Sequence, residues 1–201
     1  MKKLFFILMI LTTLHAVGQY LVLSIGEELP KCDEKMKCAT TGQTFQIGDL
    51  EEENGLLLVF SCNTCPFVLA WEDRYPVIAE LAKKNKVGFA LVNSNYMKRD
   101  GGDSMEAMIA HAKDKNYKWP YLDDQESELA NLLGAQTTPH VFLFDKNMKL
   151  VYKGAIDDNY KDAGSVEEFY LKDALNSLGS GKEIEMKETR NLGCSIKRKT
   201  T

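Results

Sequence analysis

The sequence of 201 residues lacks several features that define large classes of proteins. No basic stripe interleaved with aromatic residues occurs in it, and its net charge is -4, so we expect no binding to nucleic acid. No apolar run reaches the roughly 20 residues that a membrane-spanning helix needs. The chain is too short for two full domains, and its 44% hydrophobic content predicts one well-cored domain with appendages.

The N-terminus has the form of a secretory signal peptide, which we place at residues 1–18. Lys2 and Lys3 precede the apolar residues 4–14, and a small-residue segment ending at Gly18 offers a cleavage site. No cysteine follows the apolar stretch, which disfavours a lipoprotein. We expect a periplasmic or secreted protein without a stable membrane anchor after cleavage, and a retained N-terminal anchor is the alternative. Residues 19–180 would form the domain and 181–201 a surface tail.

Five cysteines, an odd number, remain to be arranged in a chain whose export would permit disulfides. Cys62 and Cys65 are separated by two residues and form one candidate pair. Cys32 and Cys38 flank a short polar loop and could bridge each other, or either could pair with Cys194, and the spacing does not decide between these. At least one thiol should stay free or pair between molecules.

Residues 56–69, LLLVFSCNTCPFVL, place Cys62 and Cys65 between a predicted strand and a predicted helix. The continuous apolar run 56–60 predicts a strand buried on both faces. Pro66 suits the first turn of a helix, so the cysteines should lie at or just before its N-terminus. The free N–H groups and helix dipole there favour a thiolate over a thiol. The pattern predicts a dithiol in which Cys62 attacks and Cys65 resolves the mixed disulfide.

The rest of the chain alternates predicted helices and strands. Apolar residues at helical spacing predict helices over residues 65–84, with a bend at Pro76, and over 105–115, 127–133 and 166–178. Apolar runs predict strands at 86–93, 141–144 and 150–152, the last two antiparallel, and a small N-terminal hairpin with its tip at residues 41–42. The last twenty residues show no strong periodicity. This order predicts an α/β thioredoxin-like fold, with a central mixed sheet flanked by helices and an N-terminal hairpin extension.

Several segments carry a resemblance to a known family: IGEELP at 25–30, CNTCP at 62–66, Thr138-Pro139 before a strand, and the ending GCSIK at 193–197. With these, residues 26–178 resemble the thioredoxin-like redoxins of the alkyl hydroperoxide reductase and thiol-specific antioxidant superfamily, particularly the peroxiredoxin-like group with a CxxCP centre. The resemblance implies that Thr138 and Pro139 form a cis-proline loop, which faces the cysteine pair and presents backbone to a substrate peptide. An ordinary trans proline that opens a strand is the alternative.

Two departures from related families bear on the reaction. Peroxiredoxins of this superfamily carry Pro-x-x-x-Thr-x-x-Cys, and if Cys65 is aligned as the peroxidatic cysteine, Leu58 and Cys62 stand at the proline and threonine positions. Thioredoxins carry a buried aspartate in the preceding strand, whereas residues 56–60 contain no acid. Another group must then transfer protons at Cys65, and the candidates are Glu72, Asp73 and His140.

We therefore expect an exported thiol-disulfide oxidoreductase that uses a Cys62/Cys65 couple on protein or small thiol substrates. Its partners would be a thiol or disulfide substrate protein and an upstream redox donor, and we expect no cofactor and no metal. A thiol peroxidase is one alternative. A copper-binding thioredoxin-fold chaperone using Cys62, Cys65 and His140 is another, although copper-delivery thioredoxin folds have a longer spacing between their cysteines.

Two auxiliary residues complete the candidate site. His140 could stabilise a thiolate if it lies near the pair, or it could merely start a strand and face solvent. Cys194 could be a third redox cysteine that resolves Cys62, but a structural bridge to Cys32 or Cys38 is the favoured interpretation. His111 is expected on a solvated helix flank.

Overall fold

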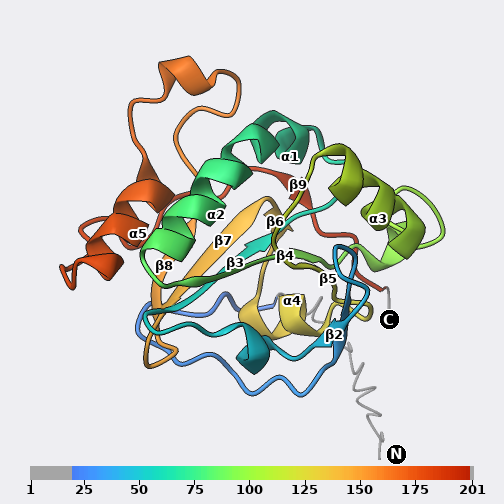
Figure 1. The fold of residues 1–201 in the computed structure, drawn as a ribbon, viewed down its shortest axis with the longest axis horizontal. Helices are drawn as coiled ribbons and strands as arrows, with labels where there is room; N and C mark the ends of the chain where they lie inside the picture. Colours follow the sequence, from blue (N-terminus) through green and yellow to red (C-terminus); the bar gives the residue numbers. More distant parts are fainter. Residues whose placement is uncertain (1–19, 200–201) are drawn as a thin grey trace, which may run out of the picture.

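A computed structural model describes residues 20–199, so the predicted signal peptide at 1–18 lies outside the described residues. A seven-stranded mixed sheet with strand order β2-β1-β5-β4-β3-β7-β8 forms the centre of the molecule (Figure 1). Its strands are β1 (Met36–Cys38), β2 (Thr44–Phe45), β3 (Gly55–Phe60), β4 (Gly88–Asn93), β5 (Tyr121–Asp123), β7 (His140–Asp145) and β8 (Leu150–Gly154). The predicted mixed α/β sheet is confirmed.

The strand that precedes the cysteines lies in the middle of this sheet. β3 pairs in parallel with β4 and antiparallel with β7, and β4 pairs in parallel with β5. The residues of β3 are buried throughout and alternate between the two faces of the sheet. Leu57 and Val59 lie on one face, and Leu56, Leu58 and Phe60 lie on the other. A strand covered on both sides has to be continuously apolar, which explains the run at 56–60.

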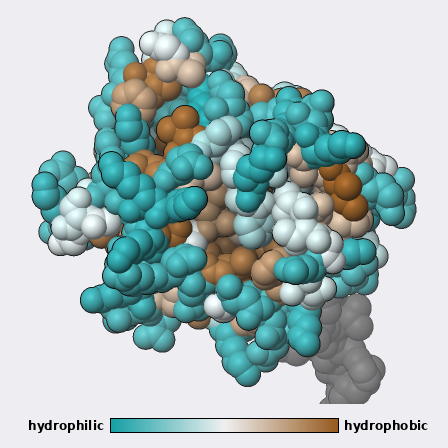
Figure 2. All heavy atoms as spheres, viewed as in Figure 1, coloured by the Kyte–Doolittle hydropathy of each residue, from teal (hydrophilic) through white to brown (hydrophobic). Residues whose placement is uncertain are grey.

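Helices cover the two faces unequally. The face of Leu57 and Val59 packs against α1 (Pro66–Trp71), α2 (Tyr75–Lys84), α3 (Met105–Asp114) and α5 (Tyr170–Gly179). The opposite face is covered by α4 (Glu128–Leu133) and by apolar residues of the N-terminal segment. Figure 2 shows a largely hydrophilic surface, with apolar side chains gathered in a recess near the centre of this view. The molecule is thus a three-layer sandwich with its sheet in the middle.

Two predicted helices differ from those observed. The helix predicted over 65–84 is divided into α1 and α2 by the 3₁₀ turn η2 (Glu72–Arg74), because Pro76 lacks an N–H and its ring clashes with the carbonyl one turn earlier. The final helix begins at Tyr170 rather than near residue 166. Asp162 instead accepts hydrogen bonds from the Gly164 amide and the Ser165 hydroxyl, which hold a separate 3₁₀ turn, η4 (Ala163–Ser165).

The N-terminal hairpin is present, and it is part of the main sheet. β1 pairs antiparallel with both β2 and β5. The second strand of the hairpin ends at Phe45, and η1 (Ile47–Leu50) follows it as a 3₁₀ turn. A further 3₁₀ turn, η3 (Tyr96–Lys98), follows β4. Within residues 20–199, no helix is long and apolar enough to cross a membrane.

The C-terminal segment is bound to the domain, which corrects the expectation of a tail that only runs over the surface. β9 (Cys194–Ser195) pairs antiparallel with β6 (Thr137–Thr138), as a two-stranded sheet beside the main one (Figure 1). Gly193 allows this approach, because a Cβ atom there would lie 2.3 Å from the Thr138 carbonyl oxygen. A strand this short leaves no periodic pattern in the sequence.

Candidate active site

Cys62 and Cys65 lie where the central strand passes into the first helix. Ser61 and Cys62 follow β3 directly, and Cys65 is the N-cap residue of α1, with Pro66 in its first turn. Both cysteines are free thiols and are buried, with 2% and 3% of their surfaces exposed. The predicted strand, the cysteine pair and the helix start are therefore found together.

The Thr138-Pro139 loop contacts both sulfurs. The peptide bond before Pro139 is cis, as the resemblance implied. The Thr138 hydroxyl oxygen lies 3.3 Å from Cys62 Sγ, and in its protonated form Cys65 Sγ donates to the Thr138 carbonyl oxygen at 3.1 Å. One residue thus supplies a hydroxyl to the first thiol and a carbonyl to the second.

Cys194 is the third thiol of this site. β9 places it opposite Thr138 in the antiparallel register, where its side chain packs against the cluster that contains Cys62 and Cys65. Cys32 and Cys38 pack on the opposite face of the sheet, and all three thiols are free. The favoured structural bridge from Cys194 to Cys32 or Cys38 is therefore wrong for this structure.

The pKa values of the three neighbouring thiols are shifted in different directions. A hydrogen bond from the Cys62 thiol lowers the pKa of Cys65 to about 5 against the opposing effect of burial, and the Cys194 thiol and the Val68 amide lower it further. The same Cys62–Cys65 hydrogen bond, followed by burial, raises the pKa of Cys62. Burial, followed by Cys65, raises the pKa of Cys194 to about 11. Cys62 and Cys65 thus titrate as a coupled pair, in which a thiol on one residue stabilises a thiolate on the other.

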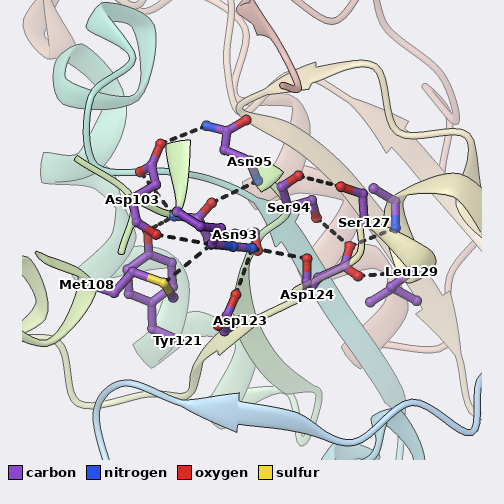
Figure 3. Close-up of polar contacts among 12 residues, drawn as sticks. Asn93, Ser94, Asn95, Asp103, Met108, Tyr121, Asp123, Asp124, Ser127 and Leu129 are labelled. Atoms are coloured by element: carbon purple, nitrogen blue, oxygen red, sulfur yellow. Dashed lines mark hydrogen bonds and ion pairs between the residues drawn. The ribbon is translucent and has the colours of Figure 1, made fainter. Parts of the chain in front are cut away.

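A buried carboxylate that the sequence analysis missed holds the loop between the cysteines. Asp103 is fully buried, and its Oδ1 accepts hydrogen bonds from the Asn63 amide at 2.8 Å and Asn93 Nδ2 at 3.1 Å. Its Oδ2 accepts from Asn95 Nδ2 at 3.0 Å (Figure 3). Asn95 Oδ1 in turn accepts from the Lys197 amide at 2.9 Å. This chain of hydrogen bonds connects the cysteine loop to the C-terminal segment.

His140 lies on the other side of the sheet from the dithiol. It alternates with Val141 along β7, and its ring packs 4.6 Å from that of Phe142, which belongs to the opposite core cluster. Its Nδ1 accepts the Gln136 amide at 3.2 Å, and burial lowers its pKa to about 3. The imidazole is buried and neutral, so it has no positive charge with which to stabilise a thiolate, and the solvent-facing alternative is wrong as well.

The acidic candidates for proton transfer are engaged elsewhere. Glu72 is buried and binds His111 Nε2 at 2.9 Å and Lys115 Nζ at 2.6 Å, so the expected solvation of His111 is wrong. Burial raises the pKa of Glu72, but these two partners outweigh it, and the pKa lies below its usual value. Asp73 is exposed and binds Arg74. The remaining proton relay is the set of thiols and Thr138 itself.

No group of three histidine, cysteine or acidic side chains within residues 20–199 is arranged to hold a metal ion. The copper alternative named Cys62, Cys65 and His140, and the sheet separates His140 from the two cysteines. Nothing in the described part of the chain therefore favours a copper site.

The fold and the site define a thioredoxin-like redoxin. The family model named Redoxin matches residues 24–168, and the chain belongs to this family. A search of curated proteins found no match.

Solved structures agree with this fold. An uncharacterized conserved protein from Geobacillus kaustophilus is 30% identical with a TM-score of 0.81, covering 89% of this chain and 94% of its own. Peroxidoxin BcpB from Mycobacterium tuberculosis is 13% identical with a TM-score of 0.58, covering 78% and 96%. The thioredoxin domain of a thiol-disulfide oxidoreductase from Bacteroides vulgatus is 14% identical with a TM-score of 0.55, covering 66% and 89%. The last two show likeness of fold alone.

Proposed function

We propose that this redoxin is an exported thiol-disulfide oxidoreductase that cycles Cys62 and Cys65 between a dithiol and a disulfide. The observation that carries the proposal is the pair of free, buried thiols at the start of α1, with both sulfurs in contact with Thr138. Export rests on the form of residues 1–18. The substrates are proteins or small molecules that contain a thiol or a disulfide.

The reaction is a pair of disulfide exchanges. The Cys62 thiolate attacks a substrate disulfide, forms a mixed disulfide and releases one substrate thiolate. Cys65 then attacks Cys62 Sγ, which releases the second substrate thiolate and leaves a Cys62–Cys65 disulfide. The substrate has gained two electrons, and a donor dithiol returns the pair to its reduced form. Running in the opposite direction, the same steps oxidise a substrate dithiol.

Attack by Cys62 requires the negative charge of the coupled pair to lie on Cys62 rather than on Cys65. Transfer of a proton from Cys62 to Cys65 within the coupled pair places the charge on Cys62. Thr138 supports that state, since its hydroxyl can donate to the Cys62 thiolate and its carbonyl can accept the Cys65 proton. A separate acidic side chain is not needed for this step.

The peroxidase alternative has less support from the geometry. A peroxidatic cysteine of this superfamily is activated by a threonine and an arginine, and Cys62 stands at the threonine position. The guanidinium groups of Arg74 and Arg99 bind Asp157 and Asp123, and in the described structure neither hydrogen bonds to a cysteine of the site. We therefore assign peroxide reduction no role in the main reaction.

A redox titration tests the proposal. The protein is equilibrated in buffers of graded glutathione or dithiothreitol potential, alkylated, and analysed by mass spectrometry for the Cys62–Cys65 disulfide. We expect a reversible two-electron transition that C62S and C65S abolish and that the matched control C32S retains. A midpoint near roughly -270 mV indicates a reductant and one near roughly -120 mV an oxidant. Absence of the transition, or fast consumption of hydrogen peroxide with a sulfenic acid at either residue, would refute the proposal.

A further inference from the structure

The C-terminal strand occupies the backbone edge that borders the dithiol. β9 pairs with Thr137 and Thr138 in the antiparallel register, as an added peptide strand does in β-augmentation. Hydrogen bonds hold the segment on both sides of Cys194: Asn191 Nδ2 donates to Thr137 Oγ1 at 2.9 Å, and the Ile196 amide donates to the Gln136 carbonyl at 3.0 Å. The segment therefore binds where a substrate peptide would, and it brings its own cysteine.

The three thiols of the site differ in accessibility. Cys62 and Cys65 are almost completely buried, whereas Cys194 is partly exposed. An external thiol in solution can reach Cys194 more readily than either residue of the pair. Thiol exchange requires in-line access to a sulfur, so the exposed thiol is the natural point of entry.

We propose that Cys194 is a third redox residue, which exchanges with the Cys62–Cys65 disulfide and connects it to external thiols. This inference rests on the proposed dithiol function. In the exchange, the Cys194 thiolate attacks Cys65 Sγ, so that a Cys65–Cys194 bond forms, the Cys62–Cys65 bond breaks and Cys62 leaves as a thiolate. The exchange transfers no net electrons, and an external dithiol then reduces the Cys65–Cys194 disulfide and becomes a disulfide itself.

Cys65 is suited to be the sulfur shared by the two disulfides, because its Sγ contacts the carbonyl oxygen of Thr138, the residue that lies opposite Cys194 in the β6–β9 register. The reduced cluster disfavours a thiolate at Cys194, first through burial and then through the negative charge at Cys65. When Cys65 is in a disulfide, that charge is gone, while Lys197 continues to favour the Cys194 thiolate. Oxidation of the pair thus makes Cys194 a better nucleophile.

The first experiment traps the new disulfide. C62S is treated with oxidised glutathione, alkylated under denaturing conditions and mapped by mass spectrometry. We expect a Cys65–Cys194 disulfide as the main product, and the same product in the matched control C32S/C62S. In G193A/C62S this disulfide should be strongly reduced, because the added methyl group clashes with the Thr138 carbonyl and displaces the strand without removing a thiol. A Cys65–glutathione adduct in place of the internal disulfide in C62S would overturn the inference.

The second experiment measures entry of electrons. Oxidised wild-type protein, C194S and the control C32S are mixed with reduced glutathione, and loss of the Cys62–Cys65 disulfide is followed with time. Because a tethered thiol acts at high effective concentration, C194S should be reduced roughly tenfold more slowly, and C32S at the wild-type rate. An equal or faster rate for C194S would refute a relay through Cys194.

The two proposals fail in different ways. If the Cys62–Cys65 couple titrates normally in wild type and C194S while the Cys65–Cys194 disulfide never forms, only the role of Cys194 is lost. If C62S forms the Cys65–Cys194 disulfide but wild type shows no reversible Cys62–Cys65 couple, the dithiol function is lost.

Discussion

Replacement of His140 by asparagine should remove a measurable part of the pH dependence of stability. His140 is 2% exposed, and its Nδ1 accepts the Gln136 amide, so the native ring is neutral with its proton on Nε2. Burial lowers its pKa to about 3, while the unfolded chain titrates near the ordinary value of about 6.5. Asparagine keeps an acceptor for the Gln136 amide and does not titrate.

The size of the effect follows from proton uptake. Because the folded pKa is lowered, the neutral ring contributes its full stability above about pH 6.5, and this contribution is lost as the pH falls toward 3. Between pH 8 and pH 5 the unfolded chain binds about one proton at this residue and the native state almost none. The wild-type free energy of unfolding should therefore fall by about 2 kcal/mol more than that of the variant.

Urea unfolding of both proteins at pH 8 and pH 5 measures this difference. The carboxyl groups titrate in both proteins, so their contributions largely cancel when the two pH changes are subtracted. If wild type and H140N lose the same stability between the two pH values, the native histidine is charged or accessible to water, and its assignment to the buried opposite face is wrong.

Three further changes test contacts elsewhere in the domain and at the loop between the cysteines. D103N places an amide N–H₂ against two side-chain amides and a backbone amide that already donate, so it should cost about 1–3 kcal/mol in urea unfolding. Unchanged stability would contradict this network. Burial, followed by Asp124, raises the pKa of Glu34 to about 8, so this carboxyl group contributes stability below about pH 4.5 that is lost as the pH rises through 8. E34Q should therefore gain stability relative to wild type between pH 5 and pH 9, and a constant difference would refute the shift. Gly55 has a φ of 130°, and a Cβ there would lie 2.0 Å from the Phe144 carbonyl oxygen. G55A should therefore lower the free energy of unfolding by at least about 1–3 kcal/mol. A smaller change would mean that β3 and β7 can separate at low cost.

The sequence predicted the parts of the site that depend on local pattern. The cis peptide bond before Pro139 is found as the family resemblance implied. The apolar run before Cys62 and Pro66 at the start of a helix instead have a local physical meaning, and the structure places both as expected. These features need no knowledge of the remainder of the chain.

The parts that the sequence did not predict depend on distant partners. Glu72 and His111 meet only after α1, η2 and α3 have packed, and no spacing rule connects them. The sequence pattern does not indicate the role of Asp103, because that role arises from three donors on different segments. The contact of Cys194 with the dithiol requires pairing of β6 with β9, and each of these strands is too short to leave a pattern.

The side-chain amide of Asn95 makes the C-terminal segment and the cysteine loop open as one cooperative unit. Its oxygen receives the Lys197 amide, its nitrogen donates to Asp103, and Asp103 receives the Asn63 amide. Release of the segment frees the oxygen of Asn95 and loosens the restraint on Asp103. The Asn63 and Lys197 amide protons should therefore exchange with solvent through the same local opening, and an N95A variant should accelerate both.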